Sequence, residues 1–158
     1  MTHLPPISWA PLAIAAATLI WAAYTDLREF TIRNTQVLAL VGLYLVYAIT
    51  SKQQAQILWN VGFALIMGLA LLLPYSRRHM GGGDLKLMTV AFLWTGLSCA
   101  LTFTIVVLVF VGLHAFAAKF SWIAAERSAQ GTRIPLAPSI SGALLAVMAI
   151  GCLKSQFA

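Results

Sequence analysis

No charged residue stands between Lys86 and Lys119, and this uncharged run constrains the fold more than any other feature of the chain. Apolar stretches of about 18 residues or more with few charges are typical of membrane-spanning helices. A single helix from Asp84 to Phe120 would be about 55 Å long, whereas the hydrocarbon core of a bilayer is about 30 Å thick. We therefore expect the run to be divided at Thr95–Ser98 into two spans.

The composition agrees with a membrane environment. Of the 158 residues, 61% are apolar and only 9% are charged, whereas roughly a quarter of the residues of a soluble domain are charged. The net charge of +6 would favour a nucleic-acid partner in a soluble protein. Here the basic residues stand singly or in pairs between apolar runs, so we expect membrane lipid and no nucleic acid as a partner.

Six apolar segments can be drawn along the chain. They predict an all-α, polytopic membrane helix bundle of about six transmembrane helices, in one integral membrane domain that covers residues 1–158. The expected segments are Ile7–Thr25, Gln36–Thr50, Gln56–Pro74, Leu85–Trp94, Ser98–Phe120 and Leu136–Leu153.

The distribution of Lys and Arg predicts the orientation of these spans. With six spans, three loops on one side carry eight basic residues, and the other side has only Lys52 and Lys154. Cytoplasmic loops of membrane proteins are enriched in Lys and Arg. We therefore expect the three basic loops in the cytoplasm and both termini outside.

The chain has two cysteines, Cys99 and Cys152, both inside expected spans. No CxxC pair occurs, so the sequence supports neither a zinc site nor a disulfide framework. We expect buried thiols that pack as small apolar groups, and no metal and no cofactor.

The acidic residues are Asp26, Glu29, Asp84 and Glu126. In the expected topology, Asp26 ends the first span and Asp84 begins the fourth, so both lie at the cytoplasmic depth of the membrane. A carboxylate at such a place is unfavourable unless it is solvated, paired or functional. Two carboxylates about 3 Å apart cannot both ionise, and one ionised and one protonated carboxyl are what an aspartyl protease needs. We therefore predict a catalytic pair.

A second interpretation of both residues is structural. Asp26 could be an interfacial charge, and Asp84 could cap a helix that begins after Gly81, Gly82 and Gly83. Glycine permits backbone conformations and close approaches that other residues forbid. The three glycines therefore predict either a flexible hairpin or a backbone surface that accepts an extended substrate strand.

At these residues the chain resembles the type IV prepilin peptidases, which are GxGD membrane aspartyl proteases. Gly81-Gly82-Gly83-Asp84 fits GxGD, and Asp84-Leu-Lys86-Leu matches the version of this family. The segment Asp26-Leu-Arg-Glu-Phe-Thr-Ile32-Arg33-Asn34 is similar to the family's D-x5-I-P-N pattern, with Arg33 in place of proline. Residues 134–138, with Pro135 and Pro138, look like the family's proline-containing start of the last helix.

The resemblance implies an aspartic endopeptidase with Asp26 and Asp84 as catalytic residues. It also implies substrate-binding or site-shaping roles for residues of the motifs, namely Gly81, Gly82, Gly83, Lys86, Ile32, Asn34, Pro135 and Pro138. The implied substrate is a prepilin or pseudopilin precursor with a leader and a hydrophobic helix, cleaved at the cytoplasmic face of the bacterial inner membrane. The chain resembles the short form of Flp-type (tight-adherence) pilus systems, which lacks the methylase domain, so methyltransferase activity is not expected.

Several alternatives remain open. A small ion-coupled transporter could use the aspartates to bind a cation, although broken helices at the bilayer midplane are typical of that class. A non-catalytic subunit of a secretion apparatus would tolerate replacement of the aspartates by asparagine. Presenilin-like proteases carry Tyr-Asp and Pro-Ala-Leu motifs, which this chain lacks. Lys86 is expected either at lipid phosphate or at the site, and His114 either in the core or as a proton carrier. Homo-oligomerisation is also left open.

Overall fold

The computed structural model describes residues 9–50, 54–77, 80–119, 126–128, 131–133 and 136–150. These residues form five helices and one pair of short strands. The strands β1 (Glu126–Ser128) and β2 (Gly131–Arg133) pair antiparallel. The helices are α1 (Trp9–Glu29), α2 (Asn34–Thr50), α3 (Gln54–Ser76), α4 (Gly82–Lys119) and α5 (Ala137–Ile150).

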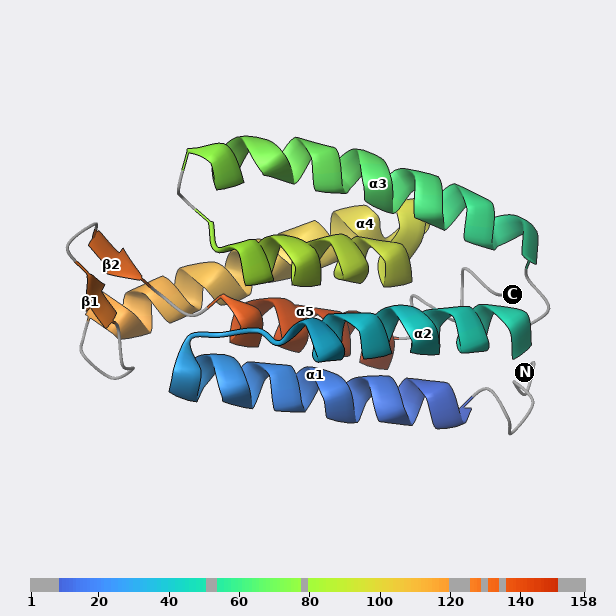
Figure 1. Ribbon diagram of the computed structural model, residues 1–158, viewed down its shortest axis with the longest axis horizontal. Coiled ribbons are helices and arrows are strands. Elements are labelled where there is room, and N and C mark those ends of the chain that lie inside the picture. Colours follow the sequence, from blue (N-terminus) through green and yellow to red (C-terminus); the bar gives the residue numbers. More distant parts are fainter. Residues whose placement is uncertain are drawn as a thin grey trace.

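The helices lie side by side along one long axis (Figure 1). The end of α1, the end of α3 and the starts of α4 and α5 lie at one end of this bundle, together with the β1–β2 pair. Helix α5 packs against both α1 and α4, whereas α3 packs mainly on α4 and contacts α2 little. The bundle therefore gathers at one end the end of α1 and the starts of α4 and α5, which are far apart in sequence.

Helix α4 is divided at Gly96, which has a φ of 55° and a ψ of −170°. This backbone conformation is open almost only to glycine. The chain runs away from the start of α4 up to this residue and then returns along the bundle (Figure 1). The predicted break at Thr95–Ser98 is thus confirmed. The described residues form five helices, so the count of six is not confirmed: the expected fourth and fifth segments are joined in α4, where Gly96 alone departs from helical dihedral angles.

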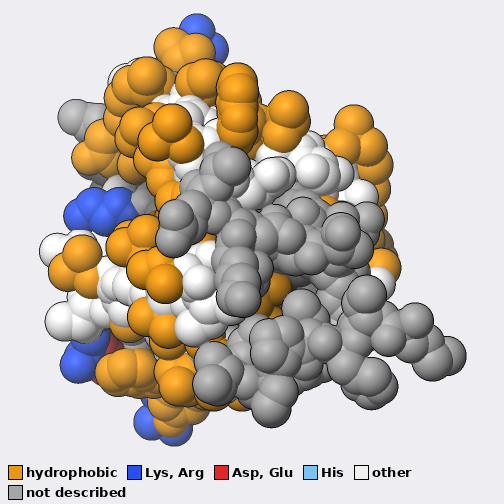
Figure 2. Space-filling view, turned by 90° about the vertical axis from the view of Figure 1, so that its right-hand side faces the viewer, with side chains coloured by type: hydrophobic (Ala, Val, Ile, Leu, Met, Phe, Trp, Pro, Cys, Tyr) orange, Lys and Arg blue, Asp and Glu red, His pale blue; other side chains and the backbone are white. Residues whose placement is uncertain are grey.

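The apolar helices make this a membrane protein. Three helical stretches are long and apolar enough to cross a bilayer, namely Ala10–Glu29, Gln56–Ser76 and Gly82–Ala117, and α2 and α5 are shorter apolar helices. Large apolar side chains lie on the surface, as Leu58 and Trp59 do at 81% and 79% exposure. Seen along the bundle from the end at which α1 begins, hydrophobic side chains lie along the top and over much of the left-hand part of the surface (Figure 2).

An aromatic cluster ties α2 to the first arm of α4. The Trp94 ring lies 5.6 Å from the ring of Tyr44 and 5.7 Å from that of Tyr47, between ring centroids. Its indole N–H donates a hydrogen bond of 3.1 Å to the carbonyl oxygen of Leu40. The side-chain amide of Asn60 donates one of 3.0 Å to the Tyr44 hydroxyl. These bonds satisfy buried polar groups in a region where lipid offers no partner.

Two details differ from the expectations. Strands β1 and β2 add a small hairpin to the all-α class, in a loop whose sequence carries no alternating apolar pattern. Cys99 is disulfide-bonded, so the expectation of a buried thiol is wrong for this residue. A disulfide forms only where the fold brings two cysteines close together, and the spacing of cysteines in a sequence does not reveal this proximity.

Replacement of Gly96 by alanine tests the break in α4. A Cβ at this φ and ψ is strained, so we expect Gly96→Ala to destabilise the protein by about 1–3 kcal/mol. Gly112, also in α4, has nothing within 4 Å of an added Cβ, so Gly112→Ala is the matched control and should be neutral or stabilising by up to about 1 kcal/mol. Thermal unfolding in detergent micelles measures both effects, and equal midpoints for the two variants would contradict the assignment.

Candidate active site

Asp26 lies in the last turn of α1 and is only 5% exposed. The helix ends at Glu29, and the next residue, Phe30, adopts a positive φ of 48°. The Phe30 N–H donates a hydrogen bond of 3.0 Å to the carbonyl oxygen of Asp26, which closes the final turn. The chain then leaves the helix toward α2, and the Asp26 side chain stays inside the bundle.

The carboxylate of Asp26 accepts a hydrogen bond from the first turn of α5. The backbone N–H of Ala137 donates to Asp26 Oδ2 at 3.0 Å, and this bond is buried. The first N–H groups of a helix have no partner within the helix and need one from outside. Pro138, which follows, has no N–H to donate. Asp26 therefore caps a helix that begins more than a hundred residues later in the chain.

Asp84 lies in the first turn of α4 and faces back toward the glycines. The Leu85 N–H donates to the Gly81 carbonyl at 3.1 Å, so Gly81 is the cap residue of the helix and Asp84 stands three positions later. The Asp84 carboxylate accepts a hydrogen bond from the backbone N–H of Gly81, as in one half of a capping box. A Cβ at Gly81 would lie 2.9 Å from Asp84 Oδ2, so this contact requires glycine.

The two carboxylates meet at this end of the bundle. Asp26 and Asp84 lie close enough for their charges to interact. Oδ1 of Asp84 is buried and has no hydrogen-bond partner among the residues that the structure describes. Two neighbouring carboxylates in such surroundings favour a state in which they hold one proton between them.

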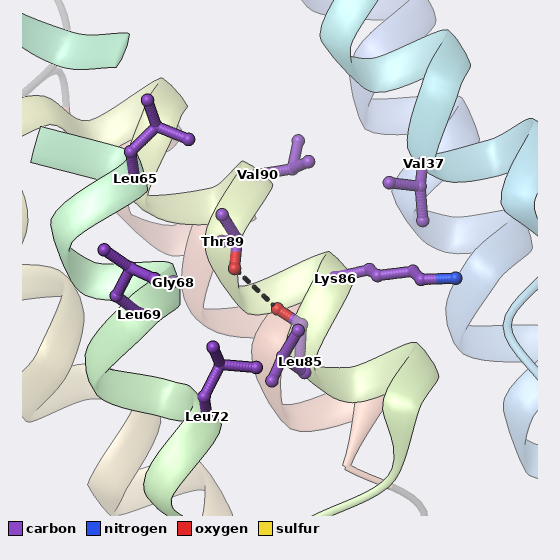
Figure 3. Close-up of a pocket in the computed structure, with 9 residues that line it drawn as sticks. All are labelled: Val37, Leu65, Gly68, Leu69, Leu72, Leu85, Lys86, Thr89 and Val90. Atoms are coloured by element: carbon purple, nitrogen blue, oxygen red, sulfur yellow. Dashed lines mark hydrogen bonds between the residues drawn. The ribbon is translucent and has the colours of Figure 1, made fainter. Parts of the chain in front are cut away.

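The loop before α2 binds the start of α4 at two points. A Cβ at Gly83 would lie 3.0 Å from the Cβ of Ile32, so Ile32 packs directly on the backbone before Asp84. The Lys86 ammonium donates a hydrogen bond of 2.9 Å to Asn34 Oδ1. Figure 3 shows the Lys86 side chain extended from α4 toward α2. Residues Ile32 and Asn34 of the first motif thus contact Gly83 and Lys86 of the second.

Arg33 stands where the resembling family has proline, and its backbone N–H is in use. It donates to Gln36 Oε1 at 3.1 Å, which a proline could not do. The Gln36 side-chain amide in turn donates to the Thr25 hydroxyl at 3.1 Å, a buried bond beside Asp26. At the position where this chain departs from the motif, hydrogen bonds through Gln36 therefore link the loop to α1.

His114, on the returning arm of α4, lies next to this network. Its Nδ1 is 3.1 Å from the hydroxyl oxygen of Ser139, which is in the first turn of α5. The imidazole also lies close enough to Asp26 for an electrostatic interaction. Among the described residues, no group of three or more His, Cys, Asp and Glu side chains could hold a metal ion.

Most of the residues that the sequence singles out come together here. Gly82 lies between Gly81 and Gly83, but an added Cβ there would contact Tyr75 and not the other site residues. Pro135 lies outside the described residues. Ala137, Gln36 and Ser139 also belong to this site, although the sequence did not single them out. Pro138 marks the start of a helix and could have pointed to the free N–H of Ala137, whereas nothing in the sequence pairs Ser139 with His114.

An apolar groove begins at Leu85, the residue that follows Asp84 in the chain (Figure 3). It has a volume of about 370 Å³ and lies over the first arm of α4, between α3 and α2. Leu85 and Lys86, the two residues after Asp84, form its end nearest the carboxylates. The other lining residues are Val37, Leu65, Gly68, Leu69, Leu72, Thr89 and Val90.

The fold and the site define a class: a helical membrane protein with two interacting aspartates at one end of the bundle. The family model of the type IV leader peptidase family matches residues 13–118, more than half of the chain and including both aspartates. The chain belongs to this family, which makes it a protease of the leader-peptidase type. Comparison with curated proteins and with solved structures gives no significant match.

Two neighbouring glycines test the contact between the motifs. Gly83→Ala would place its Cβ 3.0 Å from that of Ile32, and overpacking of this kind destabilises a protein by about 1–3 kcal/mol. Gly82→Ala is the matched control, because its Cβ would be 3.6 Å from the Tyr75 ring, an ordinary contact. We expect a lower unfolding midpoint in detergent for Gly83→Ala only. An unchanged midpoint for that variant would argue against the close approach of the loop and α4.

Proposed function

We propose that this chain is a prepilin peptidase. It cleaves the leader from prepilin or pseudopilin precursors of the Flp type at the cytoplasmic face of the bacterial inner membrane. The observation that carries the proposal is the interaction of Asp26 with Asp84 at the end of the bundle where both motifs meet. Membership in the leader peptidase family supports the reaction class.

The proposed reaction is hydrolysis by water, with the aspartates as general base and general acid. The ionised carboxylate takes a proton from water while the oxygen of that water attacks the scissile carbonyl carbon. The protonated carboxyl donates its proton to the carbonyl oxygen. When the tetrahedral intermediate breaks down, the C–N bond breaks and the carboxyl that took the proton from water passes it to the leaving nitrogen. The other carboxylate takes its proton back from the former carbonyl oxygen. Because water is the nucleophile, no acyl-enzyme forms.

The surroundings of the two aspartates differ, and we assign the roles from this difference. Both accept one backbone N–H at a helix start, from Ala137 for Asp26 and from Gly81 for Asp84. Asp26 has His114 nearby as well, whereas Oδ1 of Asp84 has no hydrogen-bond partner among the described residues. Asp26 is therefore the ionised base, and Asp84 holds the proton on the oxygen that faces the substrate carbonyl.

Two observations support the proposed orientation in the membrane. The loops near the aspartates carry most of the Lys and Arg residues, as cytoplasmic loops do. Cys99, just after the Gly96 break at the opposite end of this arm, is disulfide-bonded, and disulfides persist in oxidising compartments such as the periplasm. This orientation places the aspartates at the cytoplasmic side and both termini outside.

The groove beside Asp84 offers a place for the hydrophobic helix of the precursor. Its lining is apolar apart from Lys86 and Thr89, and it lies where α2 and α3 contact each other little. It starts at the residues that directly follow Asp84. A helix seated there would bring the peptide bond at its leader end to the two carboxylates.

Asparagine variants test the chemistry while keeping the shape of the side chains. Asp26→Asn retains an oxygen that can accept the Ala137 N–H, but it cannot take a proton. We expect Asp26→Asn and Asp84→Asn each to lower the rate of leader removal by roughly 10²- to 10⁴-fold. Glu29→Gln is the matched control, because Glu29 is an exposed acid in the same turn of α1. Cleavage of a purified Flp-type precursor, read by mass spectrometry, measures the rates. Normal processing by either aspartate variant would refute the proposal and favour a non-catalytic subunit.

Photocrosslinking tests the groove. A benzophenone amino acid replaces either Leu69, which lines the groove and is 66% exposed, or Leu108, which is 65% exposed and does not line it. In membranes that contain an inactive Asp84→Asn enzyme and the precursor, we expect a crosslink to the precursor helix from position 69 and none from position 108. Equal crosslinking from both positions would mean that the helix does not bind in this groove.

A further inference from the structure

We propose that His114 is a positioning residue for Asp26. It holds the first turn of α5 through Ser139, and this turn presents the Ala137 N–H to the Asp26 carboxylate. The effect on catalysis rests on the proposed function. The link from His114 through Ser139 to the first turn of α5, called the tie below, does not depend on that function.

Three helices meet at the first turn of α5. From α1, Asp26 accepts the hydrogen bond of the Ala137 N–H at 3.0 Å. From α4, His114 Nδ1 lies 3.1 Å from the Ser139 hydroxyl, two residues further along the same turn. Ser139 is only 1% exposed, and its contact with His114 is part-buried. A rotation or shift of the turn would break both bonds together, because two residues of one helical turn move as a unit.

The position of His114 is polar in an apolar environment. Between Leu97 and Ala118, and throughout α5, His114 is the only acidic or basic side chain. Its Nε2 is buried and has no hydrogen-bond partner among the described residues. A buried polar group without a hydrogen-bond partner destabilises the fold. If His114 served only for packing, a leucine at this position would pack at least as well, so we look for another role of the imidazole.

Electrostatics gives His114 a second link to the same carboxylate. The charged or titratable groups around the imidazole are Asp26, on α1, and Asp84, which interacts with Asp26 from the start of α4. Helix α5 contributes none. His114 therefore acts on the aspartate pair through Asp26, both by the position of the α5 turn and by its proximity to the carboxylate.

The kinetic test compares four single variants of the full-length protein. His114→Leu and Ser139→Ala remove the tie, and we expect each to lower kcat about tenfold to a hundredfold, with KM changed little, because misplacement of a catalytic group by about 1 Å has effects of this size. His114→Asn can still bond to Ser139 from the position of Nδ1, and it should recover most of the loss. Ser141→Ala is the matched control, since Ser141 is a buried serine of α5 whose hydroxyl has no hydrogen-bond partner among the described residues.

A spectroscopic measurement tests the tie without any substrate. The Ala137 amide resonance is recorded by NMR on ¹⁵N-alanine-labelled protein in detergent micelles and assigned by its absence in Ala137→Gly. We expect it to shift in Asp26→Asn, in His114→Leu and in Ser139→Ala, and to stay in place in His114→Asn and Ser141→Ala.

The outcomes separate the two proposals. If the wild-type protein cleaves no precursor, the proposed function fails, and the amide resonance still decides the tie. The inference about His114 is overturned if His114→Leu leaves both kcat and the Ala137 resonance unchanged. It is also overturned if Ser139→Ala and Ser141→Ala behave alike, or if His114→Asn loses as much activity as His114→Leu.

Discussion

The hydrogen bond from the Ala137 N–H to the Asp26 carboxylate joins the first helix of the described chain to the last, and the site is arranged around it. Both groups are buried in the bundle, where a backbone N–H or a carboxylate oxygen without a hydrogen-bond partner is unfavourable. The N-terminus of α5 supplies the hydrogen-bond donor for the side chain of Asp26, and Asp26 supplies the acceptor for this N-terminus. This mutual requirement holds α1 and α5 together at the end of the bundle where α4 also begins. Asp84 reaches the same place because it belongs to the first turn of α4.

The contacts around Asp84 show why its neighbours are glycines. At Gly81 a side chain would collide with the Asp84 carboxylate, and at Gly83 it would collide with Ile32. The glycine pattern thus serves close packing of backbone against side chain at these two positions. The hydrogen bond from Lys86 to Asn34 adds a polar tie between the same two segments. Together these contacts leave Asp84 little freedom to move away from Asp26.

The sequence predicted the helical bundle, the break near Gly96 and the pairing of Asp26 with Asp84, because these depend on strong local signals. A charge-free run, a glycine between two apolar segments and a recognisable motif can all be read directly from the order of residues in the sequence. Polar partners from distant segments are not visible there. Two examples are the bond between His114 and Ser139 and the disulfide of Cys99. Both depend on how the helices are rotated against one another, and this rotation is determined by the packing of many apolar side chains together. The helix count differed because a single residue interrupts α4.

The central claim is that Asp26 and Asp84 share one proton. Infrared spectroscopy of the protein in lipid at neutral pH tests it directly, since a protonated carboxyl group has its own carbonyl band. We predict one such band in the wild-type protein, absent from Asp84→Asn, because Asp84 holds the proton while Asp26 is ionised. A wild-type spectrum without the band, or a band that persists in Asp84→Asn, would contradict the account.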